Sequence, residues 1–101
     1  MTRRAPAPST PLTLETAVAI RPSARFHDLD GEFVLLSLDT ACYYGLDGPG
    51  ADIWRGLAAG RTLREIHAAL CERYEAGASR LESDLLALIG ELVRERLLDV
   101  R

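Results

Sequence analysis

Two histidines and two cysteines are the side chains of this sequence with the widest chemical range: His27, Cys42, His67 and Cys71. The cysteines are far apart and form no CxxC pair, so their spacing predicts neither a redox pair nor a zinc ribbon. A metal site would have to be assembled by the fold, because no short segment supplies two ligands together. We expect two free thiols in a reducing, cytoplasmic setting, since the chain shows no secretory signal.

Four aspartates could serve acid–base chemistry if the fold paired them: Asp28, Asp30, Asp39 and Asp47. They lie at expected strand ends and turns, where aspartate is favoured because its side chain hydrogen-bonds to nearby backbone. The glycine-rich stretch at 45–50, GLDGPG, matches neither GxGxxG nor a P-loop and predicts a strand-to-helix connection. No residues stand at a spacing that suggests a catalytic triad, although triads assemble in space. The sequence therefore predicts no enzyme, no metal site and no cofactor.

The overall composition limits the partners. The 101 residues allow one domain with a modest core, and 48% of them are hydrophobic, as in a folded globular chain. The formal charge of −3 gives no attraction to phosphate backbones or anionic membrane surfaces. No apolar run approaches the roughly 20 residues of a membrane span. We expect neither a nucleic acid nor a membrane as partner.

The first residues of the chain differ from the rest. Residues 1–11 contain Pro6, Pro8 and Pro11, which predicts a disordered arm, and residues 12–101 are expected to form the domain. Alternating and β-branched apolar residues predict one short strand within 12–20 and three clearer strands, Ala24–Leu29, Phe33–Leu38 and Cys42–Leu46.

The turns between the three clear strands predict how they pair. The Asp-Gly pair at 30–31 favours a two-residue hairpin, which places Phe26 opposite Leu35 on the outer face. A bulge would instead place Phe26 opposite Leu36 on the inner face, and this alternative stays open.

For the second turn we expect a three-residue loop, Asp39–Ala41. Leu36 then faces Tyr44 and Val34 faces Leu46 on a buried face, whereas Tyr43 points outward. Ala41 is an unfavourable residue for the left-handed conformation that such a loop prefers.

Three helices follow the strands. The first starts after Asp47 or Gly48 and ends at Gly60, and capping boxes at Thr62–Glu65 and Ser79–Glu82 start the second and the third. The predicted fold class is α+β: an N-terminal three-stranded antiparallel sheet followed by three helices, arranged as a winged helix-turn-helix.

A winged helix raises two binding hypotheses. DNA binding would use the start of the third helix, but there Arg80 stands against Glu82 and Asp84, with no Asn, Gln or basic stripe to read base edges. Peptide recognition would use the strand Cys42–Leu46 as an edge, to which an extended peptide adds by backbone hydrogen bonds. We favour peptide recognition. The third helix carries seven large apolar residues, which serve either as core or as the wall of a peptide groove.

An ordered set of motifs runs through the folded part of the chain. It comprises FVLLSLDTACYYGLDGPGADIW at 33–54, GRT before the second helix, ERY at its end, and the stretch LESDLL before a closing Leu-Leu. With this set the chain resembles the PqqD family over about Ala24 to Val100. The family consists of small winged-helix proteins of pyrroloquinoline quinone biosynthesis, and its relatives are leader-recognition elements for ribosomally synthesised and post-translationally modified peptides (RiPPs).

The resemblance implies binding without catalysis. Its expected partners are the leader of a precursor peptide and a separate enzyme, either the leader peptidase of a lasso-peptide pathway, which we favour, or another modifying enzyme such as a radical enzyme. The leader would pair with the edge strand and lie against the third helix. The residues that the resemblance assigns to peptide binding are Cys42, Tyr43, Tyr44, Gly45, Asp84, Leu85, Leu88, Ile89 and Leu92.

Overall fold

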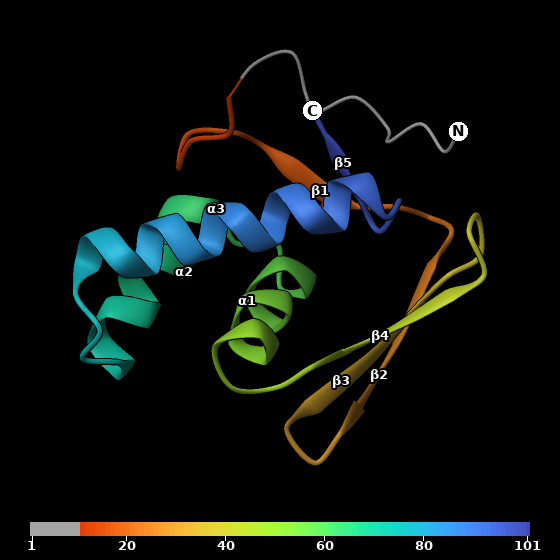
Figure 1. The fold of residues 1–101 in the computed structure, drawn as a ribbon, viewed down its shortest axis with the longest axis horizontal. Helices are drawn as coiled ribbons and strands as arrows, with labels where there is room; N and C mark the ends of the chain where they lie inside the picture. The colour runs from red at the N-terminus through yellow and green to blue at the C-terminus, as the bar shows by residue number, and fades with distance from the viewer. Residues whose placement is uncertain (1–10) are drawn as a thin grey trace, which may run out of the picture.

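The structure, a computed structural model, describes residues 11–101, so almost all of the predicted arm lies outside the described residues. Mixed α and β elements follow one another along the chain (Figure 1). The elements are β1 (Val18–Ile20), β2 (Ala24–Leu29), β3 (Glu32–Ser37), β4 (Cys42–Leu46), α1 (Gly48–Ala58), α2 (Leu63–Arg73), α3 (Ala78–Arg94) and β5 (Leu98–Val100). Strands β2, β3 and β4 form one antiparallel sheet with β3 in the centre, and β1 pairs with β5 in a second, two-stranded sheet.

The β2–β3 hairpin has the two-residue turn that the Asp-Gly pair predicts. Asp30 and Gly31 have φ angles of 55° and 90°, and Phe26 lies opposite Leu35. The predicted face is wrong, however, because Leu35 is fully buried and Phe26 therefore lies on the inner side. The centroid of the Phe26 ring is 5.4 Å from that of the buried Trp54 of α1.

The predicted register between β3 and β4 is wrong by one residue. The loop contains four residues, 38–41, so Leu35 rather than Leu36 lies opposite Tyr44. Ala41 closes this loop with a φ of 58°, and its N–H donates to the Ser37 carbonyl oxygen at 2.8 Å. Side chains alternate along a strand, so the shift turns Phe33, Leu35 and Ser37 inward and Val34 and Leu36 outward.

The helix ends confirm one predicted capping box and contradict the other. Thr62 and Glu65 exchange both hydrogen bonds of a capping box at the start of α2. Helix α3 instead begins at Ala78 after Gly77, whose φ is 89°, and Ser79 lies inside the helix without capping it. The first helix ends as predicted, since Gly60 with a φ of 80° follows its last turn.

Helix α3 ends at Arg94, and the last residues of the chain do not continue it. Arg96 has a φ of 60°, which ends the helical region, and Leu97 and Leu98 turn into the core. The following strand β5 pairs with β1, so the two ends of the described chain close over the same side of the molecule.

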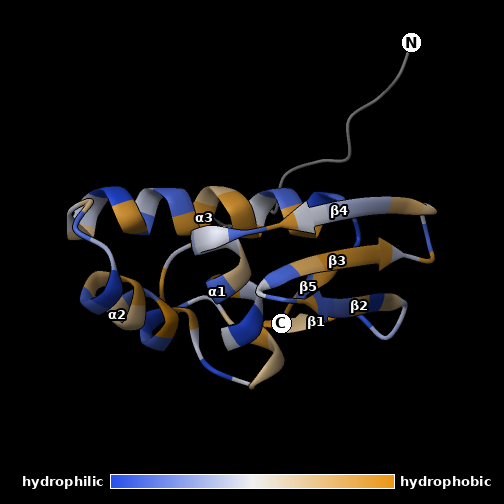
Figure 2. Cartoon of the chain, turned by 90° about the horizontal axis from the view of Figure 1, so that it is seen from below, coloured by the Kyte–Doolittle hydropathy of each residue, from blue (hydrophilic) through white to orange (hydrophobic). Residues whose placement is uncertain are grey.

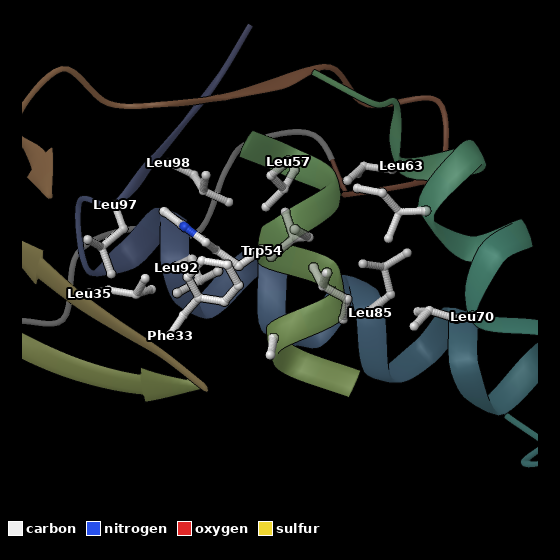
Figure 3. Close-up of a cluster of buried hydrophobic side chains, with 14 of the residues drawn as sticks. Phe33, Leu35, Trp54, Leu57, Leu63, Leu70, Leu85, Leu92, Leu97 and Leu98 are labelled. Carbon is white, nitrogen blue, oxygen red and sulfur yellow. The ribbon is translucent and has the colours of Figure 1, made fainter. Parts of the chain in front are cut away.

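One hydrophobic core joins the helices to the three-stranded sheet (Figure 3). Trp54 of α1 lies at its centre, fully buried between Leu92 of α3 and Phe33 and Leu35 of β3. Burying a large aromatic side chain stabilises a fold by several kcal/mol, on the order of 3. The core therefore fixes α1 and α3 against the sheet. None of the helices within residues 11–101 is long and apolar enough to cross a membrane.

Candidate functional site

Strand β4 is an edge of the three-stranded sheet, so one side of its backbone has no neighbouring strand in the described part of the chain. The hydrogen-bond pattern shows which groups are left open. The Leu38 N–H donates to the Ser23 carbonyl at 3.0 Å, so the even-numbered residues of β3 bond to β2 and the odd-numbered ones to β4. Within β4, Tyr44 therefore bonds to β3, whereas the N–H and C=O groups of Tyr43 and Gly45 point away from the sheet.

The side chains of β4 leave this edge accessible. Tyr43 is 71% exposed on the outer face of the sheet, as predicted, and Cys42 is an exposed free thiol at the start of the strand. A Cβ atom at Gly45 would meet nothing within 4 Å. An approaching backbone would thus find no side chain at Gly45 to hinder it.

Helix α3 passes close to part of β4 and to the start of α1, although strand and helix run at an angle to each other (Figures 1 and 2). Leu46 of β4 and Leu88 of α3 both approach Gly50, at 3.4 and 3.8 Å from the position that a Cβ atom would occupy there. Further along, Glu91 of α3 and Glu95, the residue directly after α3, lie near the Tyr44 ring. We call the open edge of β4 together with Leu88, Glu91 and Glu95 the β4–α3 surface.

Tyr44 is the polar link across this surface. Burial raises the pKa of its hydroxyl to about 12, and hydrogen bonding to Glu95 together with the negative charges of Glu95 and Glu91 adds to the effect. All three causes disfavour the phenolate, so the hydroxyl stays a hydrogen-bond donor at neutral pH.

The predicted contact residues separate into two groups. Cys42, Tyr43, Tyr44, Gly45, Leu88 and Asp84 have exposed or half-buried side chains. Leu85, Ile89 and Leu92 are fully buried, because the apolar stripe of α3 faces Trp54 and the rest of the core. These three side chains line no surface in this structure. Asp84 lies inside α3 and pairs with Arg80 at 3.6 Å, so it does not cap the helix.

Sequence reasoning missed Leu46, Glu91 and Glu95 as parts of this surface. The two glutamates follow Leu88 at intervals of three and seven residues, which places all three on one side of a helix. That spacing was the available signal. The apolar residues of α3 mark its opposite, buried side, so a prediction made from apolar residues alone does not find these glutamates.

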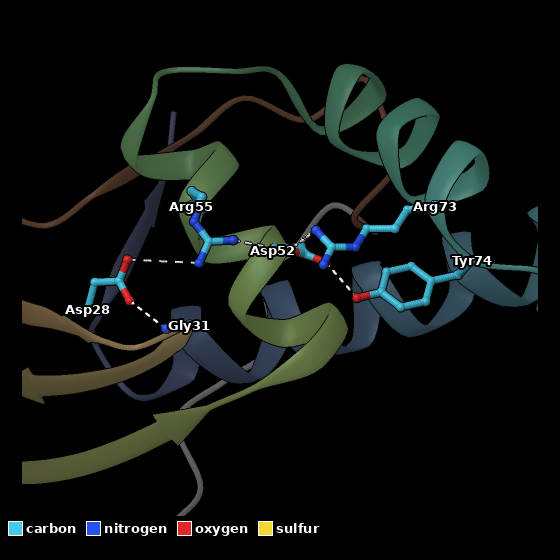
Figure 4. A network of polar contacts seen from close by, with 6 residues as sticks. All are labelled: Asp28, Gly31, Asp52, Arg55, Arg73 and Tyr74. Atoms are coloured by element: carbon cyan, nitrogen blue, oxygen red, sulfur yellow. Dashed lines mark hydrogen bonds and ion pairs between the residues drawn. The ribbon is translucent and has the colours of Figure 1, made fainter.

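A second polar cluster lies on the other side of α1 and joins three parts of the fold (Figure 4). Asp52, whose side chain is only 16% exposed, accepts hydrogen bonds from the Tyr74 hydroxyl at 2.6 Å, from Arg55 at 3.0 Å and from Arg73 at 3.2 Å. Arg55 also reaches Asp28 of the β2–β3 hairpin at 3.9 Å. The bond to Asp52 and burial raise the pKa of Tyr74. This Asp52 cluster therefore ties α1 to α2 and to the hairpin.

Comparisons with known proteins find a matching family and solved structures with a similar fold. The family model described as "Coenzyme PQQ synthesis protein D (PqqD)" matches residues 32–98. A solved structure described as "TbiB1 in Complex with the TbiA(beta) Leader Peptide" is 34% identical, with a TM-score of 0.77 over 80% of this chain and 94% of that one. A second, "Lasso peptide synthetase B1 complexed with the leader peptide", is 24% identical, with a TM-score of 0.73 over 81% and 96% of the two chains, and shows a shared fold. Comparison with curated proteins gives no match.

Proposed function

This chain belongs to the PqqD family, and on that basis we propose that it binds the leader segment of a ribosomally synthesised precursor peptide and presents it to a maturation enzyme. The leader adds as a further strand along β4. The observation that carries this proposal is the open backbone of Tyr43 and Gly45 on an edge strand, part of which lies close to α3. The protein itself contributes binding and no chemical step.

The physical basis is strand addition. A peptide paired antiparallel or parallel to β4 satisfies the outward N–H and C=O groups of Tyr43 and Gly45, which supplies affinity without reading the sequence. Its side chains alternate, so one set lies over Tyr43 on the outer face and the other set faces Leu46 and Leu88. Apolar side chains on that inner set would cover the exposed part of Leu88. The selectivity for particular leaders follows from the leader side chains that face Leu46 and Leu88.

We place the chain in a lasso-peptide pathway, with a leader peptidase as the partner enzyme. The support is the TbiB1 structure, which is 34% identical and is described in complex with a leader peptide. The description of the matching family model favours a second candidate, a PqqD-like chaperone for a radical peptide-modifying enzyme. In either case the leader would bind at the same β4–α3 surface. In the same proposal, the β2–β3–β4 sheet corresponds to the wing, and α2 and α3 to the helix-turn-helix, of a winged-helix protein.

The test removes one backbone donor and changes little else. Gly45→Pro deletes an N–H that points away from β3, so the β3–β4 ladder keeps its hydrogen bonds, as proline allows on an edge strand. We expect the affinity for the leader peptide to fall about tenfold or more, that is by about 1.4 kcal/mol. Isothermal titration calorimetry with the unmodified leader peptide measures the change.

Gly45→Ala is the matched control. It retains the N–H and adds a methyl group into open space, so we expect its affinity to stay within about twofold of the original. Circular dichroism verifies that both variants are folded. Equal leader affinities of the folded proline and alanine variants would contradict strand addition along β4.

A further inference from the structure

A pocket of about 240 Å³ opens on the exposed side of α1, between α1 and α2. It shares no residue with the β4–α3 surface, so the proposed leader binding does not use it. Its lining residues come from the two helices and their connection: Asp52, Arg55, Gly56, Ala59, Arg61, Ile66, Ala69, Leu70 and Arg73.

The charge of this pocket is opposite to that of the chain. Three arginines line it against a single aspartate, whereas the whole chain carries a formal charge of −3. Asp52 accepts hydrogen bonds from Arg55 and Arg73, and the Arg61 guanidinium forms no ion pair within residues 11–101. A guanidinium has five N–H donors, and Arg55 also pairs with Asp28 at 3.9 Å, so the donors without a protein partner belong mainly to Arg61 and Arg73 and face solvent. The pocket therefore retains the capacity to bind a further carboxylate.

The floor of the pocket is apolar. Ile66 and Leu70 of α2 are buried there, and Gly56 allows α1 to approach them closely. A Cβ atom at position 56 would lie 2.7 Å from Cγ1 of Ile66, closer than such atoms come in proteins. The occupant must thus combine a negative charge with an apolar part.

We propose that this α1–α2 pocket is a docking site for a partner protein that presents an acidic side chain next to an apolar one. The volume supports a side-chain pair as the occupant, because pockets for free small molecules usually start at roughly 300 Å³. The carboxylate pairs with Arg61 and Arg73, and the apolar side chain contacts the exposed Ala69 and the few pocket-facing atoms of Ile66 and Leu70. Charge complementarity of this kind selects the partner and speeds association.

The test uses the full-length protein and two acetylated, amidated hexapeptides, Ser-Ala-Leu-Glu-Ala-Ser and the same sequence with Gln in place of Glu. Nuclear magnetic resonance follows the Arg Nε–Hε signals and the Ile66 and Leu70 methyl signals. We expect the Glu peptide to shift the signals of Arg61, Arg73 and Leu70, and the Gln peptide to bind at least about tenfold more weakly. Acetate alone, at equal concentration, should leave the methyl signals in place.

Variants that change the charge of the pocket provide a second test. Arg61→Glu and the milder Arg61→Gln should each abolish the shifts, whereas Arg101→Glu, the same charge change outside the pocket, should leave them unchanged. Leader binding should survive in every variant, which separates a failure of this proposal from a failure of the proposed function. The absence of shifts with the Glu peptide, equal shifts with both peptides or with acetate, or shifts that persist in Arg61→Glu would each overturn the docking site.

Discussion

The β4–α3 surface and the α1–α2 pocket lie on different sides of the molecule and offer different kinds of contact. The first presents backbone N–H and C=O groups at Tyr43 and Gly45, near Glu91 of α3 and Glu95 directly after it. The second presents three guanidinium groups above an apolar floor. Backbone groups accept many sequences in one conformation, whereas fixed charges accept few partners. The comparison teaches that one small domain can combine a surface that is independent of the partner's sequence with a surface that selects by charge.

The two sites also depend on the fold in different ways. An edge strand needs only its neighbour in the sheet to be in place, and the β3–β4 ladder supplies that. The pocket needs two helices at a fixed distance, and the Asp52 cluster together with the Gly56–Ile66 contact sets this distance. Substitutions in the Asp52 cluster should therefore damage the pocket and spare the edge.

The largest effect on stability is expected for Asp52→Ala. The change removes the acceptor for Tyr74, Arg55 and Arg73 from a side chain that is only 16% exposed. Losing hydrogen bonds to a charged group at such a site costs on the order of 2 kcal/mol of the free energy of unfolding. Urea denaturation measures the loss, and leader affinity of the folded variant should stay within about twofold.

Asp84→Ala is the control for that substitution. Asp84 is 66% exposed and has one ion pair, to Arg80 at 3.6 Å. Exposed pairs of this kind contribute less than about 0.5 kcal/mol. If the two variants lost similar stability, the Asp52 cluster would not be what holds α1 to α2.

The second-largest effect is expected on leader affinity at the β4–α3 surface. Leu88→Asp places a charge where apolar side chains of the leader are expected to lie, beside Leu46. We expect leader affinity to fall about tenfold, or 1.4 kcal/mol, with binding of the Glu hexapeptide unchanged. The control is Ala87→Asp, which adds the same charge one residue away at an exposed position of α3. Leader affinities that agree between these two variants would remove α3 from the leader site.

Some elements could be predicted from the sequence because their signals are local. The bounds of β2 and β4 agree with the prediction, since Asp30-Gly31 and the Gly-Pro-Gly stretch at 48–50 end the strands. The capping box at Thr62–Glu65 depends only on four consecutive residues. Membership of the PqqD family was also predictable, from an ordered set of motifs along the chain.

Other features could not be predicted because they depend on contacts distant in sequence. The pairing of β1 with β5 joins Val18 to Val100 and involves only three residues on each side, with no turn between them to signal it. The apolar side of α3 is wide enough to serve as core or as groove, and only the position of Trp54 assigns Leu85, Ile89 and Leu92 to the core. The Asp52 cluster combines residues of three elements and leaves no sequence pattern.

The wrongly predicted register of β4 is the error with the greatest consequence for function. The substitution that tests it, at Ala41, has the smallest expected effect on stability. A three-residue loop would turn the backbone groups of Tyr44 outward in place of those of Tyr43 and Gly45. The four-residue loop exists although Ala41 has a φ of 58°, which costs an L-residue about 1–2 kcal/mol. Ala41→Gly relieves this strain but increases the freedom of the unfolded chain. We expect a net gain of about 0.5–1 kcal/mol in the free energy of unfolding.

The control is Ala59→Gly, the same substitution at a residue with a φ of −83°, which should lose rather than gain stability. Hydrogen exchange then tests the register itself. In both the original protein and Ala41→Gly, the amides of Tyr43 and Gly45 should exchange faster than those of Tyr44 and Leu46, because only the latter two bond to β3. The reverse order would mean that the loop has three residues. The β4–α3 surface would then offer the backbone groups of Tyr44 to a peptide in place of those of Tyr43 and Gly45. Its contrast with the arginine-lined pocket would rest on different groups.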